Sequence, residues 1–222
     1  IISRGKTVFG EAVAEAMSHP IGIGNATHRH PDYEGYAEGA CFPVFRRDVF
    51  EKIGYYDEDL IRSEDDELNL RLAQAGEKVY LSPKAKCEYY VRDDPVKLFK
   101  QYNQYGFWRV MALKKHRTPG GWRQFIPSGF YLSTMLFQLM RPFIHPRMRW
   151  LSWMLPISYL TAIAVGTMQT INKRGAGIGI RFPLAVMIMH LAYATGFTQA
   201  WFVPRNSITS RNRSGYYVDR SE

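Results

Sequence analysis

Two long stretches without a charged residue constrain the fold of this chain most. Residues 150–172 (WLSWMLPISYLTAIAVGTMQTIN) and 182–204 (FPLAVMIMHLAYATGFTQAWFVP) each hold 23 residues, and a helix needs about 20 mostly apolar residues to cross a bilayer. Trp150, Trp153 and Trp201 lie near the ends of the stretches, and Arg or Lys flanks each one, as is typical of membrane interfaces. Both stretches predict membrane-spanning helices. The alternative is that they are buried helices of a soluble all-α domain.

A third stretch, residues 124–140, is also free of charge but is shorter and more polar. It could span the membrane or lie in the interface as an amphipathic segment. The sequence therefore predicts an interfacial or first membrane segment over 119–149, two transmembrane helices over 150–204 and a basic tail over 205–222. Every loop in this region is positively charged, so the charges do not decide its orientation.

The charge of the chain is divided unevenly along its 222 residues. Residues 1–94 hold 18 of the 20 acidic residues and 12 basic ones, a net charge of −6, whereas residues 95–222 have a net charge of +15. A basic region often binds nucleic acid or an anionic surface. Here the basic region is also the apolar one, which favours a membrane and argues against nucleic acid as the partner.

Residues 1–118 have the pattern of an α/β domain. The spacing of apolar residues predicts a helix over 8–17, and a brief helix is expected to end near Gly54. A further helix is expected to begin at a capping box of Ser63 and Asp66 and to end near Gly76. KVYLS and CEYYV resemble strands, and Asp94 followed by Pro95 predicts the start of a long helix.

Four consecutive carboxylates, Glu64 to Glu67, begin the helix after Ser63. The helix dipole stabilises such charges, and close like charges raise one another's pKa, which can prepare a carboxylate to act as a general base. An ordinary solvated, acidic helix start is the alternative.

Five residues of the next long helix form a second candidate site: Gln101, Tyr105, Gly106, Trp108 and Arg109. A glycine within a helix costs about 1 kcal/mol relative to alanine, so the close approach of a ligand or of another backbone is expected at Gly106. The Trp108 face suits stacking and the Arg109 fork suits phosphate. Alternatively, Trp108 and Arg109 are interfacial anchors of a helix that enters a membrane.

Histidines supply the remaining candidates. His28, Arg29, His30 and Asp32 lie in one loop, where a solvated loop is a better interpretation than a metal site and Arg29 suits a phosphate contact. His190 lies within the second apolar stretch. An ionisable residue there is a functional hypothesis, but we expect a neutral histidine bonded to a neighbouring helix.

Three segments in this order resemble the C-terminal half of a family 2 glycosyltransferase: FRRDVFEKIGYYDEDL, SEDDELNLRLAQAGEKVYLSP and YYVRDDPVKLFKQYNQYGFWRV. The resemblance is to the membrane-attached bacterial enzymes of the succinoglycan-biosynthesis type and extends over residues 5–115, and HLAYATGFTQAWF is similar to the last membrane segment of that subgroup. It implies an α/β fold, the C-terminal half of a GT-A (nucleotide-diphospho-sugar transferase, Rossmann-like) domain, followed by two or three transmembrane helices. The first residue is Ile1, and we expect the chain to be a piece of a longer protein.

The resemblance also implies roles for residues. The Glu-Asp motif of the family falls on Glu64 and Asp65, with Asp65 as the catalytic base, and the extended motif of the subgroup adds Glu67, with Arg71 one turn further on. The Gln-x-x-Arg-Trp motif is altered here, as Gln101 followed by Tyr105-Gly106-Phe107-Trp108, which suits the addition of a single sugar. Arg46 and Arg47 match an Arg-Arg pair of the family, and Glu38 stands in the loop before them.

The implied function is inverting transfer of a sugar from a nucleotide-sugar donor to a lipid-linked saccharide acceptor, by a multi-pass protein of the inner membrane whose catalytic domain is cytoplasmic. The family implies a divalent metal, Mg or Mn, held by an Asp-x-Asp segment. Upstream of Glu64 this pattern occurs only as Asp57-Glu58-Asp59, in the acceptor half, so the metal ligands are expected outside this chain and the chain alone is expected to be inactive. The alternative function is that of a non-enzymatic membrane protein, a scaffold or transporter subunit.

Overall fold

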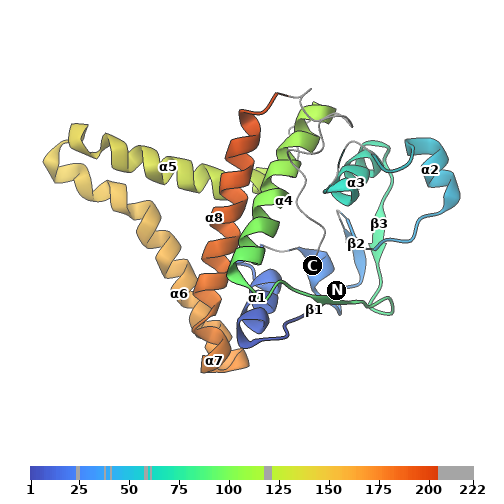
Figure 1. The fold of residues 1–222 in the computed structure, drawn as a ribbon, viewed down its shortest axis with the longest axis horizontal. Helices are drawn as coiled ribbons and strands as arrows, with labels where there is room; N and C mark the ends of the chain where they lie inside the picture. The colour runs from blue at the N-terminus through green and yellow to red at the C-terminus, as the bar shows by residue number, and fades with distance from the viewer. Residues whose placement is uncertain are drawn as a thin grey trace.

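The computed structural model describes residues 1–23, 26–37, 39–40, 42–57, 60, 62–117 and 122–204. Small sheets and short helices from the first part of the chain lie on one side of a long helix, and a group of long helices from the last part lies on the other (Figure 1). The chain is thus a helix-rich α/β structure, as its sequence pattern indicated.

Four short strands form two separate pairs. The strands are β1 (Ile2–Arg4), β2 (Gly35–Ala37), β3 (Val79–Leu81) and β4 (Glu88–Tyr90). β1 pairs with β4 in parallel, with Ser3 opposite Tyr89, and β2 pairs with β3 in antiparallel, with Tyr36 opposite Tyr80. The first pair brings the start of the chain beside the segment that leads into the long central helix.

Eight α-helices are described. Their bounds are α1 Val8–Ser18, α2 Arg47–Ile53, α3 Glu64–Gln74, α4 Pro95–His116, α5 Ile126–Met140, α6 Met154–Arg174, α7 Ala176–Gly179 and α8 Phe182–Trp201. Shorter 3-10 turns are η1 Thr27–Arg29, η2 Trp122–Phe125, η3 Arg141–Phe143 and η4 Pro146–Trp153. The helices expected over 8–17, near Gly54, before Gly76 and after Asp94 are confirmed, as are the strands expected at KVYLS and CEYYV.

Local chemistry explains the start of α4 but not that of α3. The Asp94 side chain accepts a hydrogen bond of 2.8 Å from the Lys97 N–H, with Pro95 in the first helical position. The capping box predicted at Ser63 is wrong: Ser63 has a left-handed backbone, with φ of +60°, and its side chain makes no capping hydrogen bond to α3. An N-cap needs an extended backbone to aim its oxygen at the first turn, and Ser63 does not have one.

The main core lies where α1, α4 and α8 meet. Its fully buried members include Val13, Met17, Leu98, Phe182 and Met189. A second buried cluster joins the last turns of α4 to the last turns of α8 and to Leu60. The apolar C-terminal part of the chain therefore shares its core with the α/β part.

Helices α4 and α8 are in backbone contact. A Cβ atom added at Gly106 of α4 would lie 2.1 Å from the Tyr193 carbonyl oxygen, and one added at Gly196 of α8 would lie 1.9 Å from the Asn103 carbonyl oxygen. The close approach expected at Gly106 is thus that of another backbone.

Two helical segments are long and apolar enough to cross a membrane, judged by length and composition alone: Pro146–Arg174 and Ala176–Trp201. They correspond to the two apolar stretches of the sequence. The third expected segment forms η2, α5 and η3, and α5 has 15 residues. The predicted basic tail, 205–222, lies outside the described residues.

Candidate active site

Helix α3 presents Asp65 in its first turn, on an exposed position. One oxygen of the Asp65 carboxylate accepts a hydrogen bond of 2.8 Å from the N–H of Asp66, so this side chain satisfies one of the free amides at the start of the helix. The pKa of Asp65 is raised, because neighbouring atoms remove part of its hydration and because the Asp66 and Glu64 carboxylates repel its charge. A carboxyl with a raised pKa is better suited to accept a proton than an ordinary aspartate.

An ion pair fixes this turn of α3 against α4. The guanidinium of Arg109 lies 2.6 Å from the Asp66 carboxylate, and both side chains are partly buried. Burial alone would lower the pKa of Arg109, but the charge and hydrogen bond of Asp66, together with Tyr193 and Asp65, outweigh burial, and the pKa is raised. Arg109 therefore keeps its charge, and its position beside α3 places a permanent cation close to Asp65.

A cluster of polar aromatic residues extends from this cation along α4 towards its N-terminus. The amide group of Gln101 donates to the hydroxyl oxygens of Tyr89, at 2.9 Å, and of Tyr105, at 3.1 Å. The pKa of Tyr105 is raised, first by burial and then by Tyr89, and the charge of Asp65 also acts on it. Tyr105 thus lies within electrostatic range of the candidate base and links it to Gln101.

Arg29 of η1 also belongs to this cluster. Its guanidinium lies over the Tyr89 ring, 5.3 Å from the ring centre, and its Nη1 is 3.4 Å from the Ser3 hydroxyl. Its Nε is buried and has no hydrogen-bond partner. The neighbouring His28 has its pKa lowered to about 4, first by burial and then by the charge of Arg29. A donor that is buried without a partner is the kind of group that an anionic ligand would satisfy.

Two predicted members of the site do not lie on this face of α4. Trp108 is only 3% exposed and packs in the core between α4 and α8, where Phe107 meets its ring edge to face at 5.7 Å. Gly106 lies against the backbone of α8. Both residues build the contact between α4 and α8 in this structure, whereas Gln101, Tyr105 and Arg109 face the α/β part.

Glu67 lies on the opposite, buried side of α3. Glu67 is 1% exposed. Arg71 donates two hydrogen bonds to its carboxylate, Nε to Oε1 at 2.7 Å and Nη2 to Oε2 at 2.8 Å. The other guanidinium hydrogens of Arg71 go to main-chain carbonyl oxygens of residues 53, 54 and 55, just after α2. All five N–H groups of Arg71 are thus engaged within the protein, and they tie α3 to the end of α2.

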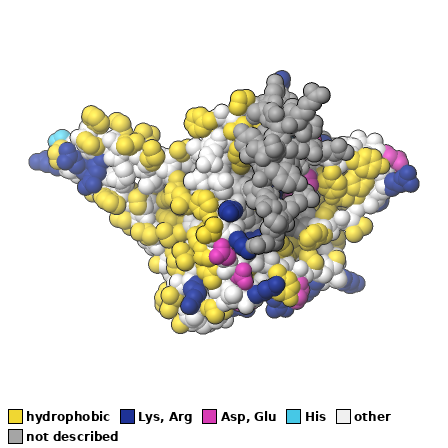
Figure 2. All heavy atoms as spheres, viewed as in Figure 1, with side chains coloured by type: hydrophobic (Ala, Val, Ile, Leu, Met, Phe, Trp, Pro, Cys, Tyr) yellow, Lys and Arg dark blue, Asp and Glu magenta, His cyan; other side chains and the backbone are white. Residues whose placement is uncertain are grey.

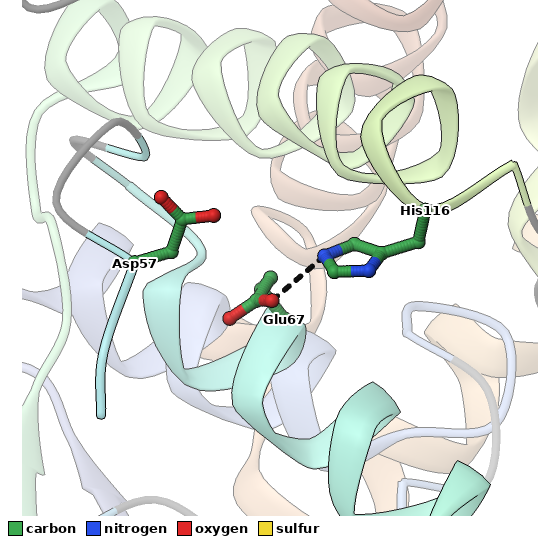
Figure 3. A group of neighbouring side chains, drawn as sticks. All are labelled: Asp57, Glu67 and His116. Atoms are coloured by element: carbon green, nitrogen blue, oxygen red, sulfur yellow. Dashed lines mark ion pairs between the residues drawn. The ribbon is translucent and has the colours of Figure 1, made fainter. Parts of the chain in front are cut away.

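Asp57, Glu67 and His116 lie close together at the end of α4 (Figure 3). Their potential ligand atoms are all within 4.8 Å of one another, and His116 Nε2 is 2.7 Å from Glu67 Oε1. Among the described residues this is the one group of three side chains that could hold a metal ion. It contains none of His28, His30 and Asp32.

The charges around this group do not suit a divalent cation. Glu67 is already paired through both oxygens with Arg71, and Asp57 forms an ion pair with Lys115. Two cations therefore already balance the two carboxylates, and a metal ion would stand beside a guanidinium and an ammonium group. We interpret the group as an ion-pair network that joins α3, α4 and the loop after α2.

The remaining sequence-based candidates have structural partners or lie outside the description. Arg46 pairs with Asp48, and Arg47 lies 3.8 Å from Glu51, both on exposed surface. Asp32 pairs with Lys86 at 3.0 Å. Glu38 lies outside the described residues.

His190 is bonded on both sides, as expected. Its Nε2 is 2.6 Å from the Gly22 carbonyl oxygen, and its Nδ1 is 3.0 Å from the Tyr159 hydroxyl. A carbonyl oxygen only accepts, so Nε2 donates to Gly22, while Nδ1 lies within hydrogen-bond distance of the Tyr159 hydroxyl of α6. His190 is thus bonded to a neighbouring helix.

Sequence reasoning did not find Tyr89 or His116. Tyr89 lies in the strand predicted at CEYYV, and nothing in that segment indicates which of its two tyrosines contacts Gln101. His116 stood at the end of a basic helix, and its proximity to Glu67 depends on how α3 and α4 cross. One signal for the burial of Glu67 was available in the sequence: it stands directly before Leu68, which is buried in α3.

Two curated proteins are similar to this chain. The succinoglycan biosynthesis protein ExoA of Rhizobium meliloti (strain 1021) is 30% identical over 195 residues, which cover 87% of this chain and 57% of that protein. A dolichyl N-acetyl-alpha-D-glucosaminyl phosphate 3-beta-D-2,3-diacetamido-2,3-dideoxy-beta-D-glucuronosyltransferase of Methanococcus voltae is 28% identical over 142 residues, 64% of this chain and 40% of that protein.

The chain spans only about half the length of these relatives. No protein-family model matches it, and no solved structure gives a significant match. The similarity to ExoA nevertheless extends over most of the chain, including the described part that carries Asp65, Gln101 and Arg109. These similarities support the resemblance that the three motifs indicate: the chain is similar to a succinoglycan biosynthesis protein and to a glucuronosyltransferase.

Proposed function

We propose that this chain is the C-terminal, acceptor-side half of a GT-A glycosyltransferase domain with its membrane attachment. The whole protein would transfer a sugar from a nucleotide-sugar donor to a lipid-linked saccharide, with inversion at the anomeric carbon, in polysaccharide or glycan biosynthesis. The similarity to ExoA and to a named glucuronosyltransferase supports the class of reaction. Residues 1–118 would form the acceptor side of the catalytic domain.

The observation that carries this proposal is the position of Asp65. It stands exposed at the start of α3 with a raised pKa, its charge reaches Tyr105, and the permanent cation of Arg109 lies beside it. Asp65 would take the proton from an acceptor hydroxyl while the oxygen of that hydroxyl attacks the anomeric carbon. The bond from that carbon to the nucleoside diphosphate would break in the same step, and the leaving phosphate oxygen would keep the electron pair.

The polar residues around Asp65 would bind the substrates. Gln101 and Tyr105 offer an amide and a hydroxyl to sugar hydroxyl groups, and Arg29 offers a buried, unpartnered donor to a phosphate oxygen. Arg109 would stabilise negative charge near Asp65. In contrast, we assign Gly106, Trp108, Glu67 and Arg71 to the framework that holds α3 and α4, because their contacts are all internal.

A divalent metal, as the family implies, would stabilise the charge of the leaving diphosphate. Because Asp57, Glu67 and His116 are balanced by internal cations, we place its Asp-x-Asp ligands in chain beyond these 222 residues. The donor and the lipid-linked acceptor would meet at the inner membrane, with the catalytic domain in the cytoplasm. The exposed apolar side chains of α5 and α6 support attachment to a membrane.

Replacing the base tests the proposal in the full-length protein. Asp65→Asn keeps the shape of the side chain but cannot take a proton, so we expect sugar transfer from a nucleotide-sugar to fall about 10²- to 10⁴-fold. The circular-dichroism spectrum should be unchanged. The matched control is Glu51→Gln, which removes a carboxylate from an exposed turn of α2 and should leave transfer within about twofold.

The alternative, a scaffold or transporter subunit with an α/β extramembrane domain, predicts a different result. Full-length wild-type protein would then transfer no sugar from any nucleotide-sugar offered with membrane lipid as acceptor. Transfer that Asp65→Asn leaves intact would instead remove Asp65 from the role of base.

A further inference from the structure

The turn between α6 and α8 is bound to the α/β part of the molecule. Lys173, in the last turn of α6, lies 2.7 Å from Glu15 of α1, and the neighbouring Arg174 pairs with Glu11 of α1. If α6 and α8 crossed a bilayer as a hairpin, this turn would lie on the far side of the membrane from the α/β part. It could not then form ion pairs with α1.

The other end of α8 is also bound to the α/β part. The ammonium group of Lys114, near the end of α4, donates hydrogen bonds to the carbonyl oxygens of Ala200 and Val203, each at 2.8 Å, and of Trp201 at 3.0 Å. The three carbonyls belong to the last residues of α8 and to the turn that follows it, so Lys114 holds this end of the helix. Both ends of α8 therefore lie on the same side of any membrane as the α/β part.

Between its ends α8 follows α4 closely. Gly106 and Gly196 bring the two backbones into contact, and the Asn103 side chain donates to Thr195 Oγ1 at 3.0 Å. The first turns of α4 also carry the exposed residues Lys97 and Lys100. If α8 crossed the hydrocarbon layer, α4 would have to enter it too and carry these charged lysines towards it, which is unfavourable.

The α5–α6 arm, residues 122–174, has a different character. It leaves the body near the end of α8 and returns near the start of α8, and its two helices converge on a turn far from the α/β part (Figure 1). Figure 2 shows apolar side chains along the arm and basic ones at its tip. The large apolar side chains that are at least half exposed on α5 and α6 are Ile126, Leu132, Met135, Leu136, Leu139, Met154, Ile157, Leu160, Val165 and Met168.

The arm has the ends of a membrane hairpin and one helix of full spanning length. Helix α6, with 21 residues, extends about 32 Å, against a hydrocarbon layer of about 30 Å. Helix α5, with 15 residues, extends about 22 Å, so the adjoining turns η2 and η3 would have to cover the remaining distance. The tip between them carries Arg141, Arg147 and Arg149, with Trp150 and Trp153 beside them, all exposed. Arginine and tryptophan together are typical of the interface between lipid and water.

We propose that α5 and α6 cross the lipid bilayer as a hairpin, while α8 does not cross it and lies along the membrane surface with α4. The start of α5, the end of α6 and the turn between α6 and α8 are then on the same side of the membrane as the α/β part. The tip between α5 and α6 is on the opposite side. This exchanges the roles expected from the sequence, in which residues 182–204 were predicted to span the membrane and residues 124–140 to span it or to lie in the interface. The proposal concerns topology and stands apart from the reaction.

The distribution of positive charge agrees with this topology. On the side of the membrane where the α/β part lies, the segments 114–123 and 173–181 hold seven lysines and arginines. On the opposite side, the tip holds three arginines. The sequence holds no acidic residue between Asp94 and Asp219, although Glu15 and Glu11 of α1 pair with Lys173 and Arg174. The side with more lysine and arginine is usually cytoplasmic, which places the α/β part in the cytoplasm.

Single cysteines in full-length protein test the topology. With Cys41, Cys87 and any other cysteine of the full-length protein changed to serine, Arg147→Cys marks the tip, Ala176→Cys marks the turn between α6 and α8, and Lys84→Cys marks the α/β part. All three positions are exposed. Each variant is treated with a membrane-impermeant maleimide in right-side-out and in inside-out membrane vesicles, and again after detergent is added, when every cysteine should react.

We expect Ala176→Cys and Lys84→Cys to react in the same kind of vesicle and Arg147→Cys to react in the other kind. Reaction of Ala176→Cys on the side opposite Lys84→Cys would show that α6 and α8 form the hairpin and would overturn the proposal. Reaction of Arg147→Cys on the side of Lys84→Cys would overturn it as well, because the arm would not reach across the bilayer. Sugar transfer is not measured, so failure here is distinct from failure of the proposed function.

Discussion

Replacing Gly106 by alanine tests the contact between α4 and α8 on which both the site and the topology depend. The new Cβ would lie 2.1 Å from the Tyr193 carbonyl oxygen and 2.8 Å from the Phe197 nitrogen. Both are backbone atoms of α8, so no side chain can turn away. The two helices must separate by about 1.3 Å to restore an ordinary contact of 3.4 Å.

Two opposing effects set the size of the change. Alanine favours a helix interior over glycine by about 1 kcal/mol. Overpacking of a buried contact costs about 1–3 kcal/mol, and a gap of 1 Å along the interface removes about half of the dispersion attraction between the atoms that line it. Because the second cluster, with Trp108 and Phe197, depends on this interface, we expect a net loss of about 2 kcal/mol, or roughly 4–8 °C in Tm.

Gly129→Ala is the matched control. Gly129 lies within α5, is exposed, and an added Cβ would meet nothing within 4 Å. Only the helix preference then acts, and Tm should rise by roughly 2–4 °C. The assay is thermal unfolding of the full-length protein in detergent, followed by circular dichroism at one fixed scan rate. A Gly106→Ala variant that rises in Tm as the Gly129→Ala variant does would refute the backbone contact.

Two further predictions concern α3. Asp66→Asn removes a charge that raises the pKa of Asp65, so the pKa of Asp65 should fall. Because Asp65 must be ionised to act as a base, the acidic limb of the profile of kcat/KM against pH should move to lower pH. An acidic limb that does not move would contradict this prediction. Arg71→Lys breaks the two contacts of Arg71 with the buried Glu67 and should lower the free energy of unfolding by about 2–3 kcal/mol in chemical denaturation. The control is Arg47→Lys, whose wild-type side chain is 90% exposed, and it should change that free energy by less than about 0.5 kcal/mol. Equal losses in the two variants would show that the contacts of Arg71 with Glu67 contribute nothing to stability.

The elements of the α/β part could be predicted because their signals are local. Asp94 with Pro95 begins α4, and the glycines at 54 and 76 end helices in conformations with φ of +81° and +76°, which glycine adopts without strain. The buried residues Leu68 and Leu72 lie four positions apart on α3, as the period of about 3.6 residues of an amphipathic helix requires. These features need only a few neighbouring residues to specify them.

The arrangement of the long helices could not be predicted in the same way. A core helix and a spanning helix have the same composition, so the apolar residues of α8 did not reveal that α1 and α4 cover one side of it. Trp108 illustrates the same limit, since its indole ring suits a binding face as well as a core. The candidate base was found from its motif, but its link to Tyr105 and Arg109 depends on how α3 crosses α4.

The five donors of Arg71 have an evolutionary consequence. Three of its bonds end on main-chain carbonyl oxygens after α2, and a carbonyl oxygen is present whatever side chain its residue carries. Substitutions at Ile53 and Tyr55 therefore leave these acceptors in place, while no other side chain can reproduce the planar fork at 71. Among homologues this loop can diverge in sequence and keep its shape, provided that the arginine and the glycine at 54 persist.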